Sequence, residues 1–244
     1  MVRQLSGEAP SLPSQLDKAA RIAGALYLLA ILVGPFSLIY VPNTLLRSDD
    51  PLVTARDILA HEMLFRLAIV GDLLIGIIFL FVVLALYRLL KEVDQNLAVL
   101  MVILGGIMQT LIFVLNALNW VAALLLMRGA AFLAVFDTNQ RYALAMLFIH
   151  LHAQGNVINE MFWGLWLFPF GVLVIKSRFL PSILGIWLIV ECFAYVILSL
   201  TGLLRPQYYD TVFTFGQPAF FAEIAIALWL LIRGAKVKPI SVPA

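Results

Sequence analysis

The sequence predicts an all-α integral membrane protein: a bundle of six transmembrane helices with both termini in the cytoplasm. Of its 244 residues, 63% are hydrophobic and only 12% are charged, against about 45–50% and about 25% in soluble domains. The apolar residues also form charge-poor runs of about 20 residues or more, the length that crosses the hydrocarbon core of a bilayer. The sequence lacks the alternation typical of strands, and helices satisfy their own backbone hydrogen bonds in lipid.

The chain divides into one membrane domain and two short tails. We expect a flexible cytoplasmic tail over residues 1–17, a transmembrane domain over 18–235 and a short cytoplasmic tail over 236–244. The predicted spans are residues 22–46, 64–87, 97–127, 141–175, 179–203 and 212–232. Pro35 in the first span and Pro169 in the fourth each remove a backbone donor and favour a bend.

Helix-start signals lie in the loops that follow the first and third spans. Asp50 precedes Pro51, an N-cap residue followed by proline at the first helical position. A short amphipathic helix is therefore predicted in the first outer loop, with four apolar residues on one face: Leu52, Ala55, Leu59 and Met63. Asp137 and Gln140 have the spacing of a capping box before the fourth span.

The distribution of lysine and arginine predicts the orientation. Cytoplasmic loops carry an excess of these residues. With the N-terminus inside, ten of the 16 basic residues lie on the inner side and six on the outer side. The outer residues are Arg47, Arg56, Arg66, Arg128, Arg141 and Arg205. We expect a multi-pass protein of the plasma or inner membrane, because outer-membrane proteins are β-barrels.

Several short motifs stand out at the ends of the predicted spans. They include Ala20-Arg21-Ile22-Ala23-Gly24, Leu86-Tyr87-Arg88-Leu89-Leu90-Lys91, Phe162-Trp163-Gly164-Leu165-Trp166-Leu167-Phe168-Pro169, Lys176-Ser177-Arg178-Phe179-Leu180-Pro181 and the ending Leu228-Trp229-Leu230-Leu231-Ile232-Arg233-Gly234. In combination they resemble a family of mainly bacterial six-helix membrane proteins, domain of unknown function family 4386. The resemblance covers roughly residues 18–235 and implies the helix count and the topology. It implies no activity and no functional residue.

Polar side chains inside the predicted spans are the candidates for function. A charge at the centre of a membrane helix costs about 2.5–3.5 kcal/mol on insertion scales, so its presence needs a reason. The candidates are Arg66, Asp72, Asn116, Asn119, His152, Asn156, Glu160, Glu191 and Glu223. His152, Asn156 and Glu160 are four residues apart and share one helix face.

From the heights of these residues along their helices we predict a polar cavity that opens to the extracytoplasmic side. In this hypothesis Arg66 pairs with Asp72 or Glu160, and Glu191 and Glu223 form the floor. The alternative is that the polar groups only hold helices together, at about 0.6 kcal/mol per contact. Arg66 could also extend to the outer headgroups, and the aromatic cluster of Phe162, Trp163 and Trp166 fits packing better than function.

Metal binding has weaker support. His61, His152 and Glu160 are the candidate ligands, but His152 and Glu160 are eight residues apart, too far for shared coordination on a straight helix at about 1.5 Å rise per residue. The sequence also lacks a P-loop, a dinucleotide fingerprint and a nucleophile elbow. We predict no cofactor.

Three functional classes remain open. The first is binding or transport of a small molecule, a lipid headgroup or an ion; the second is an intramembrane enzyme, such as a metal-assisted hydrolase; the third is a structural or sensory component. The bilayer is the expected partner, and a homodimer is expected because six helices alone form a narrow pathway. Nucleic acid is not expected, since the net charge is only +2 and the basic residues are scattered.

Overall fold

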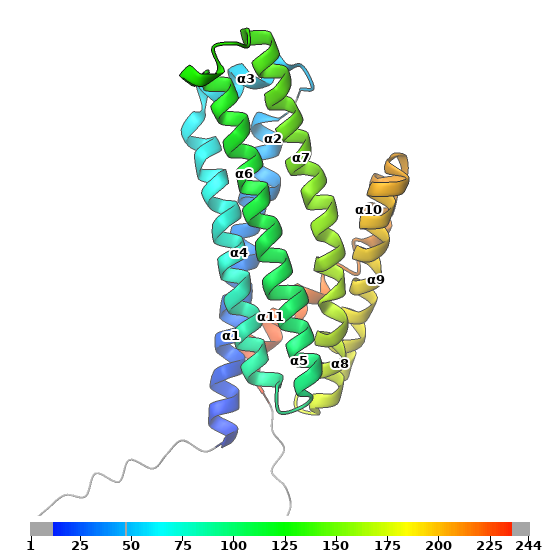
Figure 1. Ribbon diagram of the computed structural model, residues 1–244. Coiled ribbons are helices and arrows are strands. Elements are labelled where there is room, and N and C mark those ends of the chain that lie inside the picture. Colours follow the sequence, from blue (N-terminus) through cyan, green and yellow to red (C-terminus); the bar gives the residue numbers. More distant parts are fainter. Residues whose placement is uncertain (1–11, 47, 236–244) are drawn as a thin grey trace, which may run out of the picture.

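The computed structural model describes residues 12–46 and 48–235 and shows an elongated helical bundle (Figure 1). Every regular element in these ranges is helical. The elements are α1 (Leu12–Pro35), η1 (Phe36–Tyr40), α2 (Val41–Leu45), α3 (Pro51–Ala60), α4 (Glu62–Leu90), α5 (Gln95–Met101), η2 (Val102–Met108), α6 (Gln109–Arg128), η3 (Ala131–Leu133), α7 (Thr138–Leu165), α8 (Leu167–Ser177), α9 (Ser182–Leu204), η4 (Pro206–Tyr208), α10 (Tyr209–Gly216) and α11 (Ala222–Ile232).

Five helical stretches are long and apolar enough to cross a membrane. They are Ser14–Leu45, Glu62–Leu90, Gln95–Arg128, Thr138–Ser177 and Ser182–Leu204. Each overlaps one of the first five predicted spans over most of its length, so the prediction of a helical membrane protein is confirmed at this level. The predicted tails fall mostly outside the described residues, although α1 already begins at Leu12.

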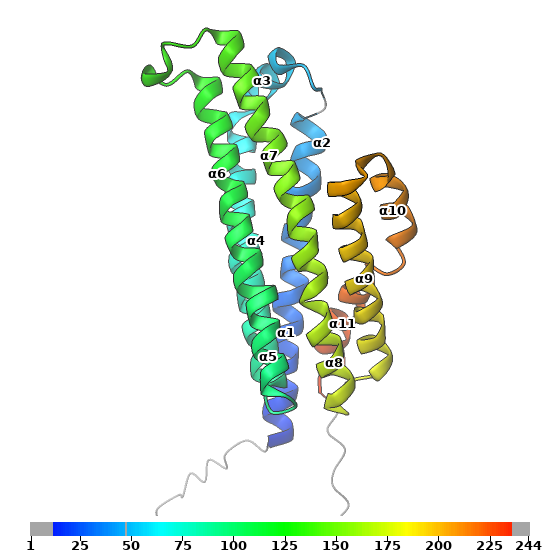
Figure 2. The same ribbon diagram turned by 45° about the vertical axis from the view of Figure 1, so that its right-hand side comes forward.

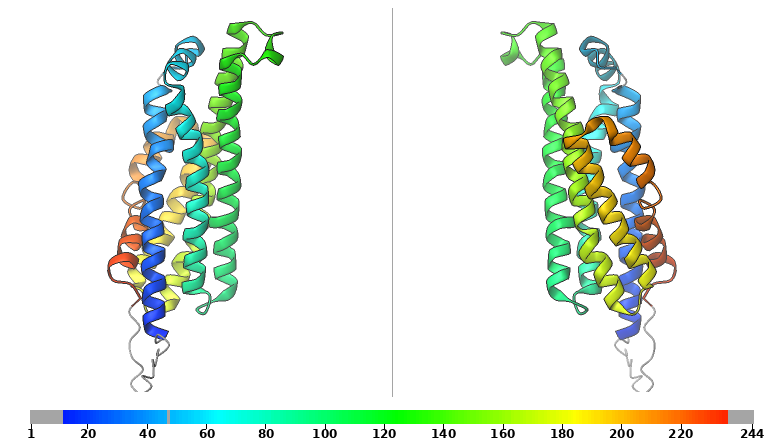
Figure 3. Two further views of the ribbon diagram at one scale, coloured as in Figure 1. Left: turned by 90° about the vertical axis from the view of Figure 1, so that its left-hand side faces the viewer. Right: turned by 90° about the vertical axis from the view of Figure 1, so that its right-hand side faces the viewer.

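The sixth predicted span, residues 212–232, is not one continuous helix. A turn over residues 217–221 separates α10 from α11. Pro218 lies in this turn and has no backbone N–H to continue a helix. Because α11 has 11 residues, it is only about 16 Å long at 1.5 Å per residue, half the thickness of the hydrocarbon core. Figure 3 shows α11 lying beside α1, and α10 beside α9.

The predicted bends coincide with irregular backbone. The π-helical segment η1 begins directly after Pro35, so the first span changes its hydrogen-bonding pattern there. The fourth span breaks between α7 and α8 at Trp166, where Pro169 provides no donor for the preceding turn. A second π-helical segment, η2, was not predicted and contains Gly105 and Gly106.

Both predicted helix starts are confirmed. The Asp50 carboxylate accepts a hydrogen bond from Leu52 N at 2.8 Å at the start of α3. Asp137 and Gln140 form a complete capping box at the start of α7. The predicted apolar face of α3 is only partly right, since Ala55 is buried whereas Leu52 and Met63 are exposed.

At the opposite end of the bundle, Asp94 caps α5 and connects it to α8. Its carboxylate accepts a hydrogen bond from Leu97 N at 3.2 Å and one from Lys176 Nζ at 2.8 Å. The Lys176 ammonium and the Leu97 N–H hold the pKa of Asp94 below its usual value. This contact fixes the end of the fourth span beside the start of the third.

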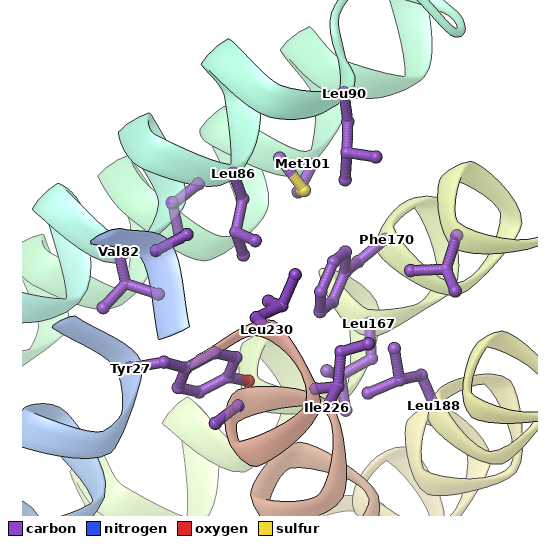
Figure 4. Packing of buried hydrophobic residues seen from close by; sticks show 14 of the residues in the cluster. Tyr27, Val82, Leu86, Leu90, Met101, Leu167, Phe170, Leu188, Ile226 and Leu230 are labelled. Atoms are coloured by element: carbon purple, nitrogen blue, oxygen red, sulfur yellow. The ribbon is translucent and has the colours of Figure 1, made fainter. Parts of the chain in front are cut away.

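Two buried apolar clusters fill the bundle, one above the other. Figure 4 shows the cluster near α11, where Tyr27 lies among apolar side chains with its hydroxyl directed toward that helix. The second cluster lies under α3 and includes Phe65 and Trp120. We call this upper part of the bundle the α3 end. There α6 and α7 extend beyond the end of α9 (Figure 2).

Candidate functional site

A buried aspartate–histidine pair lies between α4 and α7. Asp72 Oδ2 and His152 Nε2 form a hydrogen bond of 2.7 Å, and the two side chains are 0% and 4% exposed. The Trp120 ring of α6 stacks on the His152 ring, with centroids 3.8 Å apart. The second oxygen, Asp72 Oδ1, has no hydrogen-bond partner among the described residues. The hydrogen bond therefore joins α4 to α7, and the ring stack adds α6 to the same contact.

An asparagine pair forms the next polar layer. Asn116 Nδ2 donates to Asn156 Oδ1 at 2.8 Å, joining α6 to α7. A side chain at Gly155 would place its Cβ 2.0 Å from Asn116 Oδ1. The glycine therefore creates the space in which the Asn116 amide lies against α7.

Glu160 connects the bundle to the first half of the broken sixth segment. It is buried on α7 and accepts a hydrogen bond from the Tyr209 hydroxyl at the start of α10. Its other oxygen, Oε2, has no partner among the described residues. The contact connects α10 to the bundle through a carboxylate and a phenol.

Glu223 and Glu191 form a carboxylate pair beside the second half of that segment. Glu223 lies in the first turn of α11 and accepts a hydrogen bond from the Tyr27 hydroxyl of α1. Glu191 of α9 is fully buried, and neither of its oxygens has a partner among the described residues. The two carboxyl groups lie close enough to interact electrostatically, so two acidic groups share one apolar environment.

A cavity of about 210 Å³ is in contact with one member of this carboxylate pair. Its walls are mostly aromatic and aliphatic, and Glu223 is one of its lining residues. The aromatic residues are Tyr27, Phe79, Phe113, Trp163, Trp166 and Tyr195. No basic side chain is among the lining residues within the described part of the chain. The lining therefore combines aromatic faces with an acidic group and, among the described residues, no basic side chain.

The π-helical segment η1 borders the same cavity, which Leu38 and Ile39 line. The first residue of α6, Gln109, also lines it and directly follows η2. Gln109 Nε2 donates to Phe162 O at 3.1 Å, which fixes the amide at the cavity wall. Gly105 allows the Trp166 ring to pack flat against η2, since a Cβ there would lie 3.0 Å from the ring.

The structure distributes the nine candidate residues over separate contacts instead of one cavity. Asp72 with His152, Asn116 with Asn156, and Glu191 with Glu223 are three such pairs. The expected pairing of Arg66 with Asp72 or Glu160 is not formed. Arg66 Nε instead binds Glu62 Oε1 at 2.7 Å on the surface, because the two residues are four positions apart on one helix face.

The candidate metal ligands also lie in different environments. His61 is exposed at the junction of α3 and α4, His152 binds Asp72, and Glu160 binds Tyr209. The described ranges contain no group of three or more His, Cys, Asp or Glu side chains arranged to hold a metal ion. Asn119, the remaining candidate, is half-buried on α6.

Sequence reasoning missed the tyrosines that bind the carboxyl groups. Tyr27 and Tyr209 each donate to a glutamate on a distant helix. Tyr195 lies within electrostatic reach of Glu160, Glu191 and Glu223. Tyrosine is common at membrane interfaces and in helix packing, so its position in the sequence gave no signal. The tryptophans Trp163 and Trp166, expected to serve packing, line the cavity.

A family model, described as Domain of unknown function (DUF4386), matches residues 22–234. The chain belongs to the DUF4386 family. It is similar to an "Uncharacterized protein" of Archaeoglobus fulgidus, with 28% identity over 177 residues that cover 71% of this chain and 87% of the relative. No solved structure matches the chain. The resemblance seen in the sequence is thus confirmed, and the function must be argued from the geometry.

Proposed function

We propose that this DUF4386 protein binds an apolar organic cation, such as a substituted ammonium or phosphonium ion, in the aromatic cavity. The observation that supports this proposal is the cavity itself, which six aromatic side chains and Glu223 line together. Beside it, both oxygens of the buried Glu191 lack a partner among the described residues. Binding is also the first step of transport, the functional class favoured by polar groups within membrane helices.

The chemistry of the walls selects a cation over an anion or a neutral ligand. Aromatic faces attract cations by about 0.5–2 kcal/mol per contact. Two carboxyl groups in an apolar setting would repel an anion, and each is costly to ionise without a counter-charge. A bound cation supplies that charge and takes the place of protons that otherwise neutralise the pair. Binding is therefore proposed to release protons.

Access is proposed from the side of the bundle. Pro35 and Ile39 line the cavity and are exposed, so the cavity reaches the surface along α1 and η1. An apolar cation partitions into the bilayer and would arrive at this surface directly. This route replaces the extracytoplasmic opening that the sequence predicted.

The orientation with both termini in the cytoplasm of a plasma or inner membrane remains part of the proposal. The first residues of α1 and the end of α11 lie at the same end of the bundle (Figure 1). Arg21 Nη1 donates to Leu231 O at 3.1 Å, which joins these two segments. The excess of basic residues in the predicted inner segments supports the cytoplasmic assignment of this end.

Binding of tetraphenylphosphonium to the purified protein in detergent tests the function. We expect saturable binding by isothermal titration, weaker by about tenfold or more in Glu223→Gln, as loss of a charged partner implies. Affinity should fall as the pH is lowered, because protons compete for the same carboxylates. Glu160→Gln is the matched control, since it alters a buried glutamate that does not line the cavity.

Neutral triphenylphosphine oxide separates charge recognition from simple apolar binding. Equal affinity for the neutral compound, or unchanged phosphonium binding in a folded Glu223→Gln protein, would show that the proposed role of the carboxylate is wrong. Thermal unfolding of each variant establishes that it is folded.

A further inference from the structure

A second hollow lies on the outer surface of the bundle, between α4 and α6 at the α3 end. It is a groove of about 700 Å³. Its lining residues are Arg66, Ile69, Val70, Val121, Leu124, Leu125, Arg128, Gly129 and Ala130. The groove shares no lining residue with the aromatic cavity, so it is a separate feature.

The upper end of the groove is positively charged. Arg66 Nε and Arg128 Nη1 both bind Glu62 Oε1, at 2.7 and 3.1 Å. A third guanidinium, that of Arg141, lies against Gly129, where a Cβ would be 1.8 Å from Nη1. Only a residue without a side chain leaves room for this approach. Arg66 and Arg128 thus share one carboxylate, while Arg141, which donates to Thr138 Oγ1 at 3.2 Å, adds a third positive charge beside Gly129. Positive charge is therefore in excess at this end of the groove.

The rest of the groove is apolar. Ile69 and Val70 form one wall on α4, and Val121, Leu124 and Leu125 form the other on α6. Val70 and Leu125 are 47% and 46% exposed. A free inorganic anion would use only the charged end and would leave these walls uncovered. An amphiphile with an anionic head and an acyl chain would use both.

The depth of the charged end fits a lipid headgroup. From Arg88 at the other end of α4 to Arg66, the helix rises by about 33 Å at 1.5 Å per residue, close to the roughly 30 Å of a hydrocarbon core. Asp72, buried and bonded to His152, is the one charged residue between them. If Arg88 is placed at the headgroups of one leaflet, Arg66 therefore lies at the depth of the phosphate groups of the other leaflet.

We propose that this groove is a binding site for an anionic phospholipid. Arg66 and Arg128 hold the headgroup, Arg141 adds positive charge from behind Gly129, and one acyl chain lies between α4 and α6 along Ile69 and Leu125. Guanidinium groups bind phosphate through paired, charge-assisted hydrogen bonds. The excess positive charge selects a lipid with net negative charge over a zwitterionic one.

Lipid-dependent thermal unfolding of the purified protein in detergent tests the site. Phosphatidylglycerol should raise the midpoint of unfolding, whereas phosphatidylcholine and inorganic phosphate should not. The double variant Arg66→Gln/Arg128→Gln should bind phosphatidylglycerol more weakly by about tenfold or more, because it loses hydrogen bonds to a charged group. Arg205→Gln is the matched control, because Arg205 is an exposed arginine outside the groove.

A second variant keeps the test decisive if the double variant fails to fold. Glu62→Gln removes the carboxylate that competes for Arg66 and Arg128, so it should tighten phosphatidylglycerol binding. An equal shift with phosphatidylcholine would contradict selection by charge, and an equal shift with phosphate alone would identify a free-anion site. Unchanged or weaker phosphatidylglycerol binding in Glu62→Gln would overturn the role of the arginines.

Discussion

Asp72 and His152 form a contact in which each side chain depends on the other. Both are almost fully excluded from solvent and lipid, and the stacked Trp120 ring leaves His152 little freedom to find another partner. Removing one member of a buried pair leaves the other unsatisfied, whereas replacing both can be neutral. The pair therefore specifies how α4, α6 and α7 are rotated relative to one another.

A double-mutant cycle at this pair should show strong coupling. Asp72→Leu and His152→Leu should each destabilise the protein by about 3–5 kcal/mol, because each leaves one buried polar group unpaired. The double variant should be more stable than the sum of the single effects predicts. Unfolding by denaturant in mixed micelles measures all four proteins. Additive effects would mean that the hydrogen bond contributes little.

The local pairs show what the sequence could and could not reveal at the residue scale. Glu62 and Arg66 are four residues apart, so their ion pair was available from helical spacing alone. Asp72 and His152 are 80 residues apart, and their contact depends on the relative rotation and height of two helices. The sequence identified both residues as candidates but provided no information on that rotation.

At the scale of elements, hydropathy located the first five spans and failed at the sixth. The turn that separates α10 from α11 contains Ala219, Phe220 and Phe221. A mean hydropathy over this window does not distinguish these apolar side chains from those of a continuous membrane helix. The break follows instead from Gly216, Pro218 and the attachment of each half to a different neighbour, α9 and α1. It also places Glu223 in the first turn of a short helix beside the cavity.

Close packing of α1 against α11 depends on Gly24. A Cβ at this position would lie 2.4 Å from Leu231 N, a backbone atom that cannot move without shifting α11. Gly24→Ala should therefore destabilise the protein by about 1–3 kcal/mol and speed hydrogen exchange in α11. Gly34→Ala on the same span is the control, because its Cβ would make only ordinary contacts with the side chains of Ile75 at 3.7 Å and Leu38 at 3.9 Å. Equal stability of the two variants would contradict the tight packing.

At the scale of the whole molecule, the cavity and the groove lie at different heights and contain opposite charges. Glu223 belongs to the cavity near α11, whereas Arg66 and Arg128 belong to the groove at the α3 end. From the sequence, all the polar candidates were predicted to line a single cavity. Helical rise gives the height of a residue along its helix but not the direction in which its side chain points. Which side chains face the interior follows only from the packing of α4, α6 and α7.

The orientation of the bundle decides which leaflet supplies the lipid in the groove. Cys192 is the single cysteine of the chain and is buried, so introduced cysteines report their own accessibility. With both termini in the cytoplasm, a membrane-impermeant maleimide should label Asp49→Cys on intact cells. It should label Glu92→Cys, whose parent side chain is 85% exposed at the other end, only after permeabilisation. The reverse pattern would invert the proposed topology and assign the Arg66–Arg128 groove to the cytoplasmic leaflet.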